Sequence, residues 1–124
     1  MYDKELVLQI LKQIKNSIEL IEKRISPVKT SEDFVDSEEG LEKLDAICMQ
    51  LLAIGEGLKQ LDKITNKRLL SKYPQIEWDK AMKMRDVIAH HYFDVDEEIV
   101  FIVCKKELPK IKDILIKIIK DIAK

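Results

Sequence analysis

The only two histidines of the chain stand side by side within the stretch MKMRDVIAHHYFDVDEE. Arg85 comes five residues before His90, and Tyr92 follows two residues after it. Histidine takes and gives protons near neutral pH, and the arginine guanidinium is always charged and matches the oxygens of a phosphate. A histidine acid or base beside an arginine is therefore a set of groups suited to cleaving a phosphodiester. In RNA, the 2′-hydroxyl of the substrate could act as the nucleophile, so that no metal would be required.

The spacing of these residues does not bring all of them to one face of a helix. A helix is expected over roughly residues 77–92, on which Asp86 and His90 share one face and Arg85 and Tyr92 share another. Arg85 and His90 lie about 140° apart around the axis, so two helices meeting across a dimer axis would be one way to bring them together. Adjacent histidines point about 100° apart and make poor joint metal ligands. We therefore expect no metal and no cofactor.

A purely structural role for the same residues is the alternative. Asp86 and His90, four residues apart, make an ordinary surface pair on a helix. Arg85 could form an ion pair with a carboxylate such as Glu56 or Asp86, and the aromatic residues after the histidines could plug the end of a bundle. Spacing alone leaves both explanations open.

The rest of the chain predicts helices that would carry this stretch. Apolar residues recur at three- and four-residue steps over roughly residues 3–25 and 38–62, which indicates two long amphipathic helices. After residues 77–92, a last helical region begins near Glu97, and Pro109 either kinks it or starts a new helix. The fold is predicted to be all-α, a bundle of about four main helices.

Short signals within these segments predict where helices begin and where they meet. Ser37 is expected to cap the second helix, and Asp94 or Asp96 the helix that follows the histidines. Gly55 and Gly57 lie inside the second helix, where each costs about 1 kcal/mol relative to alanine. Their presence indicates a close approach of another segment at that point.

Size and composition narrow the class of protein. The 124 residues are expected to form a single domain, residues 1–124. The net charge of −1 gives no global basic field, so any RNA contact would be local. Cys48 and Cys104 lie in apolar periodic stretches. With no secretory signal and no apolar run near the roughly 18 residues of a membrane span, we expect buried free thiols in a cytoplasmic protein without membrane contact.

Several separated stretches together resemble the HepT-like branch of the HEPN superfamily, over roughly residues 41–120. The resemblance lies in an IGE helix, a YPxIxW break, an MRxxxxHxYF core and a later LP. In this chain these are residues 54–56, 73–78, 84–93 and 108–109. Motifs that occur together in this order are more specific than an arginine–histidine spacing alone.

The resemblance implies an up-and-down bundle of four to five helices that forms a homodimer. It also implies a metal-independent endoribonuclease, the toxin of a type VII-like toxin–antitoxin pair whose antitoxin is a minimal nucleotidyltransferase. Carried over through the R-x-x-x-x-H-x-Y motif, Arg85 would bind the scissile phosphate of a tRNA or messenger RNA, and His90 would be the general acid or base. Asp86 would orient the site, and Tyr92 would be the residue silenced by attached adenylate. His91 receives no role.

The second function that the sequence allows is a binding module. A non-catalytic HEPN domain could dimerise and bind a nucleotidyltransferase, with Arg85, Asp86 and His90 forming a polar interface network. The nearly neutral net charge mildly favours this alternative, and the intact motif opposes it.

Overall fold

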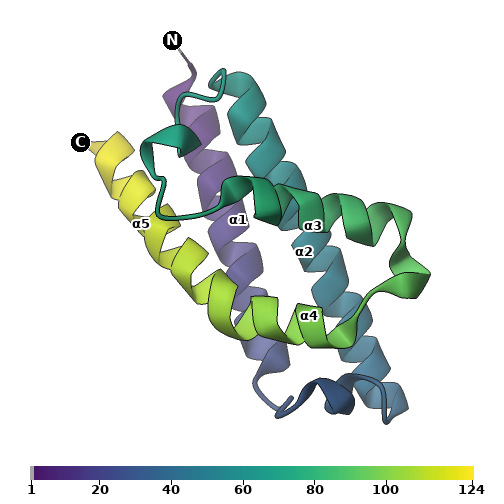
Figure 1. Ribbon diagram of the computed structural model, residues 1–124. Helices are drawn as coiled ribbons and strands as arrows, with labels where there is room; N and C mark the ends of the chain where they lie inside the picture. Colours follow the sequence, from purple (N-terminus) through teal and green to yellow (C-terminus); the bar gives the residue numbers. More distant parts are fainter. Residues whose placement is uncertain (1) are drawn as a thin grey trace.

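The computed structural model describes residues 2–124, and within them every regular element is helical (Figure 1). The α-helices are α1 (Lys4–Ile25), α2 (Glu38–Ile64), α3 (Trp78–His90), α4 (Glu97–Ile102) and α5 (Leu108–Ala123). The helix α1 lies between α2 and α5 and packs against both, while α3 packs on α2. The predicted all-α bundle is confirmed. Among residues 2–124, every helix is too short or too polar to span a lipid bilayer.

The periodic apolar residues form the inward faces of the helices, as expected. Those of α1 that are buried are Val7, Ile10, Leu11, Ile14, Ile18, Ile21 and Ile25. The predicted caps at Ser37 and Asp96 are confirmed: the Ser37 hydroxyl accepts from the Gly40 N–H at 3.0 Å, and the Asp96 carboxylate from the Glu98 N–H at 2.8 Å. These bonds satisfy backbone donors that a helix leaves unpaired at its start.

The chain stays helical from α4 into α5 by way of a π turn, Val103–Glu107. In this turn the Leu108 N–H donates to the carbonyl of Val103, five residues back. Pro109 then lies in the first turn of α5, and having no N–H it cannot donate a hydrogen bond back to the π turn. Of the two alternatives, a kink within one helix or the start of a new helix, the structure has the second: Pro109 lies at the start of α5. The preceding turn is nevertheless helical.

The π turn also keeps one face of this long helical run turned inward. Val100, Cys104 and Leu108 are all buried, at two successive four-residue steps. With 3.6 residues per turn, each such step would rotate the side chain by about 40° away from the core. The wider π turn offsets this rotation, so the buried face continues into α5.

Two hydrogen bonds fix the place where α3 begins. The hydroxyl of Tyr73 donates to Asp121 Oδ2 in α5 at 2.7 Å, and the indole Nε1 of Trp78 donates to the Tyr73 carbonyl at 3.0 Å. Burial, followed by the bond to Asp121, raises the pKa of Tyr73 to about 12. The YPxIxW segment is therefore an anchor that ties the start of α3 to the end of α5.

The end of α3 differs from the prediction. The helix was expected to reach residue 92, but it ends at His90, and a separate 3₁₀ turn covers Tyr92–Asp94. His91 leaves the helical conformation, with φ −135° and ψ 41°. Because of this break, Arg85 and Tyr92 do not share a helical face. Their separation of seven residues therefore does not place their side chains on the same side of α3.

The predicted close approach at the glycines of α2 is confirmed on both sides of the helix. A methyl group at Gly55 would overlap the Arg85 Cβ of α3 and lie 3.1 Å from its Cγ. A methyl group at Gly57 would lie 2.7 Å from Ile14 Cγ1 of α1. The glycines therefore let α2 fit between α1 and α3.

Both cysteines are free and buried, as predicted. Burial, more than the nearby charges, raises the pKa of Cys48 to about 11 and that of Cys104 to about 12. Cys48 lies on α2 and Cys104 lies in the π turn. Both thiols are therefore protonated at neutral pH.

The substitution Gly55→Ala should destabilise the protein and displace α3. The gain in helix propensity, about 1 kcal/mol, is smaller than the overpacking cost of about 1–3 kcal/mol at a site this close. Urea unfolding followed by circular dichroism should show a lower midpoint. Gly57→Ala meets only side-chain carbons, those of Ile14 and Ile10, so its loss should be smaller. A midpoint unchanged by Gly55→Ala would mean that the two helices are free to separate.

Candidate functional site

Arg85 lies on the face of α3 that packs on α2, and its side chain is only 26% exposed. Its Nε is buried against the Glu56 carboxylate in an ion pair that lacks hydrogen-bond geometry. Its Nη1 donates to Asp86 Oδ1 at 3.2 Å. Both carboxylates named as partners in the structural alternative are therefore engaged, and the guanidinium is held in a fixed orientation.

Asp86 has a second cationic partner that the sequence reasoning did not identify. Lys59 of α2 donates from Nζ to Asp86 Oδ1 at 2.7 Å. The Lys59 hydrogen bond, and then the Arg85 guanidinium, hold the pKa of the Asp86 carboxyl below its ordinary value. Lys59 stands three residues after Glu56, a spacing that puts both on one side of α2; this was the only sequence signal for it.

His90 is the last residue of α3 and is exposed. Among the described residues it forms no ion pair with Asp86, which is occupied by Lys59 and Arg85. Nor do His90 and Arg85 share a hydrogen bond among these residues. One copy of the chain thus brings Arg85 and Asp86 together but leaves His90 separate, at a place where a substrate or a second protein can reach it.

Tyr92 is oriented by a hydrogen bond to a residue of α2. Its hydroxyl donates to Asp45 Oδ1 of α2. This hydrogen bond, and then burial, raises the pKa of Tyr92 to about 12. The aromatic residues do not plug the bundle, however: Tyr92 is 42% exposed and Phe93 is fully exposed. That part of the structural alternative is wrong.

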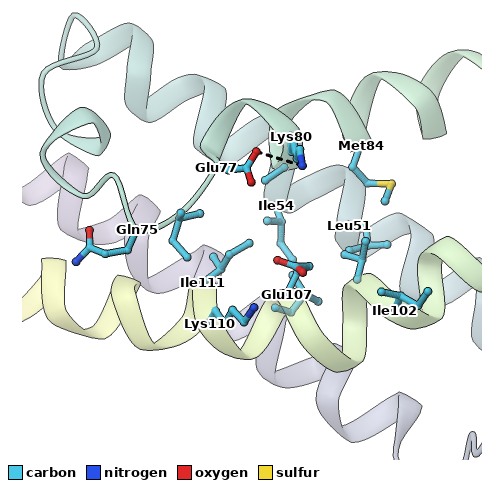
Figure 2. A pocket seen from close by; sticks show the side chains of 14 residues that line it. Leu51, Ile54, Gln75, Glu77, Lys80, Met84, Ile102, Glu107, Lys110 and Ile111 are labelled. Atoms are coloured by element: carbon cyan, nitrogen blue, oxygen red, sulfur yellow. Dashed lines mark ion pairs between the residues drawn. The ribbon is translucent and has the colours of Figure 1, made fainter.

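A hollow of about 530 Å³ lies between α3 and the junction of α4 with α5, and Figure 2 shows the side chains that line it. Leu51 and Ile54 of α2 contribute to its apolar lining, and the Glu77–Lys80 ion pair, at 3.1 Å, lies at its edge. None of the predicted site residues lines it. Within residues 2–124, no three His, Cys, Asp or Glu side chains are placed to hold a metal ion.

Comparison with known families decides what kind of chain this is. A family model described as "Ribonuclease HepT-like" matches residues 14–118. The chain belongs to the HepT-like family. The resemblance inferred from the IGE, YPxIxW and MRxxxxHxYF stretches is thereby confirmed at the level of the family.

This HepT-like chain is similar to proteins of Methanocaldococcus jannaschii and Thermococcus cleftensis. It is 35% identical over 114 residues to a Methanocaldococcus jannaschii protein named "Gamma-glutamylcyclotransferase and putative RNase". The aligned region covers 92% of this chain and 48% of that protein. It is 30% identical over 102 residues to a "Probable ribonuclease HepT" of Thermococcus cleftensis. That aligned region covers 82% of this chain and 86% of that protein. The chain spans about half to three-fifths of the Methanocaldococcus relatives that it matches. No solved structure matches it.

Asp45→Ala should lower the pKa of Tyr92 in this HepT-like chain from about 12 toward the ordinary value of about 10. The hydrogen bond requires the neutral phenol. Its stabilisation is therefore complete below about pH 10 and is lost as pH rises through the folded-state pKa. Carbon-13 NMR of tyrosine Cζ would follow each ring. Tyr73, bonded to Asp121 instead, is the internal control. An unmoved Tyr92 titration would contradict the assigned bond.

Proposed function

We propose that this HepT-like chain is an endoribonuclease that cleaves RNA without a metal. The observation that carries the proposal is the motif R-x-x-x-x-H-x-Y, present at Arg85, His90 and Tyr92 in a chain of the Ribonuclease HepT-like family. The geometry supports it, because Arg85 is held in place beside Asp86 while His90 is open to solvent.

The roles follow from the chemistry of RNA. A His90 side chain accepts the proton of the 2′-hydroxyl, whose oxygen attacks the phosphorus, and the bond to the 5′-oxygen breaks. A second acid protonates the departing 5′-oxygen. Arg85 stabilises the negative charge that builds on the phosphate oxygens. Before RNA binds, Asp86 keeps the guanidinium oriented through the bond to Nη1.

In this proposal a homodimer provides the second acid–base group that one copy of the chain lacks. With His90 and Arg85 apart in a single chain, a second copy would bring another histidine to the same cleft, one acting as base and the other as acid. The surface near His90 supports this arrangement. Val87 and Phe93, three residues to either side of His90, are 47% exposed and fully exposed. Large apolar side chains around a site are typical of a surface that a partner covers.

The proposed cellular role is that of a toxin silenced by a minimal nucleotidyltransferase. Tyr92 is the proposed target because its hydroxyl can form a phosphodiester with a nucleotide. The ring is 42% exposed, so an enzyme can reach it once the bond to Asp45 opens. The RNA substrate is a tRNA or a messenger RNA.

A non-catalytic module is the second candidate function. It is favoured by the ion pairs of Arg85 with Glu56 and Asp86, which neutralise the charge that would attract a phosphate. In that case the network would form part of an interface with a nucleotidyltransferase. An RNA cleavage assay separates the two functions.

Arg85→Ala and His90→Ala should each lower RNA cleavage at least about 100-fold, the usual loss for a charge-stabilising or acid–base group. Purified protein would be incubated with total RNA and tRNA in excess chelator. Sedimentation of the same protein preparation without RNA should give the mass of two chains. His91→Ala is the matched control, because this neighbouring exposed histidine has no assigned role. Circular dichroism would show that each variant is folded.

Normal cleavage by folded His90→Ala protein would rule out the assigned chemistry. Absence of cleavage by the wild-type chain, with an unmodified mass, would favour the binding module. An intact mass that is higher by one nucleotide would mean that the purified protein had been silenced.

Attachment of a nucleotide to Tyr92 should abolish cleavage. The added phosphodiester brings negative charge and bulk next to the place where the RNA phosphate must lie. The protein would be modified with a nucleotidyltransferase and ATP, and the extent followed by intact mass. Tyr92→Phe, which accepts no nucleotide, should stay active under the same treatment. Full activity of completely modified protein would exclude this mode of silencing.

A further inference from the structure

Two cations from different helices share one carboxylate oxygen at the site. Lys59 Nζ and Arg85 Nη1 both donate to Asp86 Oδ1, at 2.7 Å and 3.2 Å. Because both bonds end on the same atom, the two nitrogens cannot be farther apart than these two distances together. Cations this close can contact two oxygens of a single phosphate group.

Lys59 is the more accessible of these two cations. Its side chain is 40% exposed, against 26% for Arg85. An ammonium group has three donors, and the bond to Asp86 uses one of them. Arg85, by contrast, has its Nε against Glu56 and its Nη1 on Asp86. Lys59 therefore keeps two donors for an incoming anion, and Arg85 keeps those of Nη2, which forms no hydrogen bond among the described residues.

The charges of the network give Lys59 a second effect. Glu56 and Asp86 carry two negative charges, and Lys59 and Arg85 carry two positive charges, so the four side chains balance. Without Lys59 the network would carry a net charge of −1 and would repel a phosphate. An anion that replaces Asp86 as the partner of both cations gains two charge-assisted bonds in one step.

We propose that Lys59 is a second phosphate-binding residue of the RNA site and binds the same phosphate as Arg85. Before RNA binds, Asp86 keeps the two cations close together. The inference rests on the proposed ribonuclease function and adds to it a residue from α2, outside the R-x-x-x-x-H-x-Y motif. Its role is to bind and position the phosphate, while proton transfer stays with His90.

The test measures RNA binding separately from cleavage. A fluorescent 2′-O-methyl RNA, which lacks the free 2′-hydroxyl, would be titrated with wild-type, Lys59→Met and Lys59→Arg proteins at several salt concentrations. Lys63→Met is the matched control, since Lys63 lies one turn along α2, is exposed, and forms no ion pair among the described residues. Cleavage of natural RNA would be measured for the same proteins.

Lys59→Met should weaken binding at least about 10-fold, the loss expected for a hydrogen bond between charged groups. The slope of log affinity against log salt should fall by about 0.7, the value for one phosphate contact on a single strand. The KM for natural RNA should rise about as much as binding weakens, with kcat changed less than about 3-fold. Lys59→Arg should retain most of the affinity, and Lys63→Met should match the wild type.

The possible failures are distinguishable. If wild-type protein cleaves RNA but Lys59→Met keeps wild-type affinity, salt slope and KM, the role of Lys59 is overturned and the ribonuclease stands. A folded Lys59→Arg as weak as Lys59→Met would equally overturn a role based on charge. If the wild-type chain, at unmodified mass, neither binds nor cleaves RNA, the ribonuclease proposal fails and that for Lys59 fails with it.

Discussion

The missing side chain at Gly55 lets the backbone of α3 lie directly against α2 at Arg85. Every contact of the charged network follows from this approach. Glu56 is the next residue along α2 and meets Arg85 Nε, and Lys59, about one turn later, meets the residue after Arg85. A larger separation of the helices would leave each of these charges to water, where ion pairs contribute little.

The network has a particular electrostatic character because its charges alternate. Each cation lies beside a carboxylate, and this attraction offsets part of the desolvation cost of burying Arg85. The same balance keeps the guanidinium from binding anions indiscriminately, since a phosphate must first compete with Glu56 and Asp86. At the far end of α3, beyond His90, no such network exists among the described residues, and the surface there is aromatic and exposed. The charged network and the exposed aromatic residues thus lie at different points of one helix.

The features that could be predicted are those that depend on local spacing. Apolar periodicity and side-chain caps predicted α1, α2 and α5, and the glycines of α2 predicted a close approach, because these depend on residues a few positions apart. The end of α3 at His90 could not be predicted, since no glycine or proline marks it. The pairing of Lys59 with Asp86 joins residues 27 positions apart, and it depends on which faces of α2 and α3 meet. The π turn was missed because a four-residue step also fits an ordinary helix.

The two buried thiols make the opening of the bundle visible to chemistry. Only a thiolate reacts readily with an alkylating reagent, and at neutral pH Cys48 and Cys104 are both protonated and covered by the core. Their labelling therefore has to pass through states in which α2 or the π turn has come away from its neighbours. The rate of labelling at each cysteine then reports how often that part of the native protein opens, with no foreign group introduced.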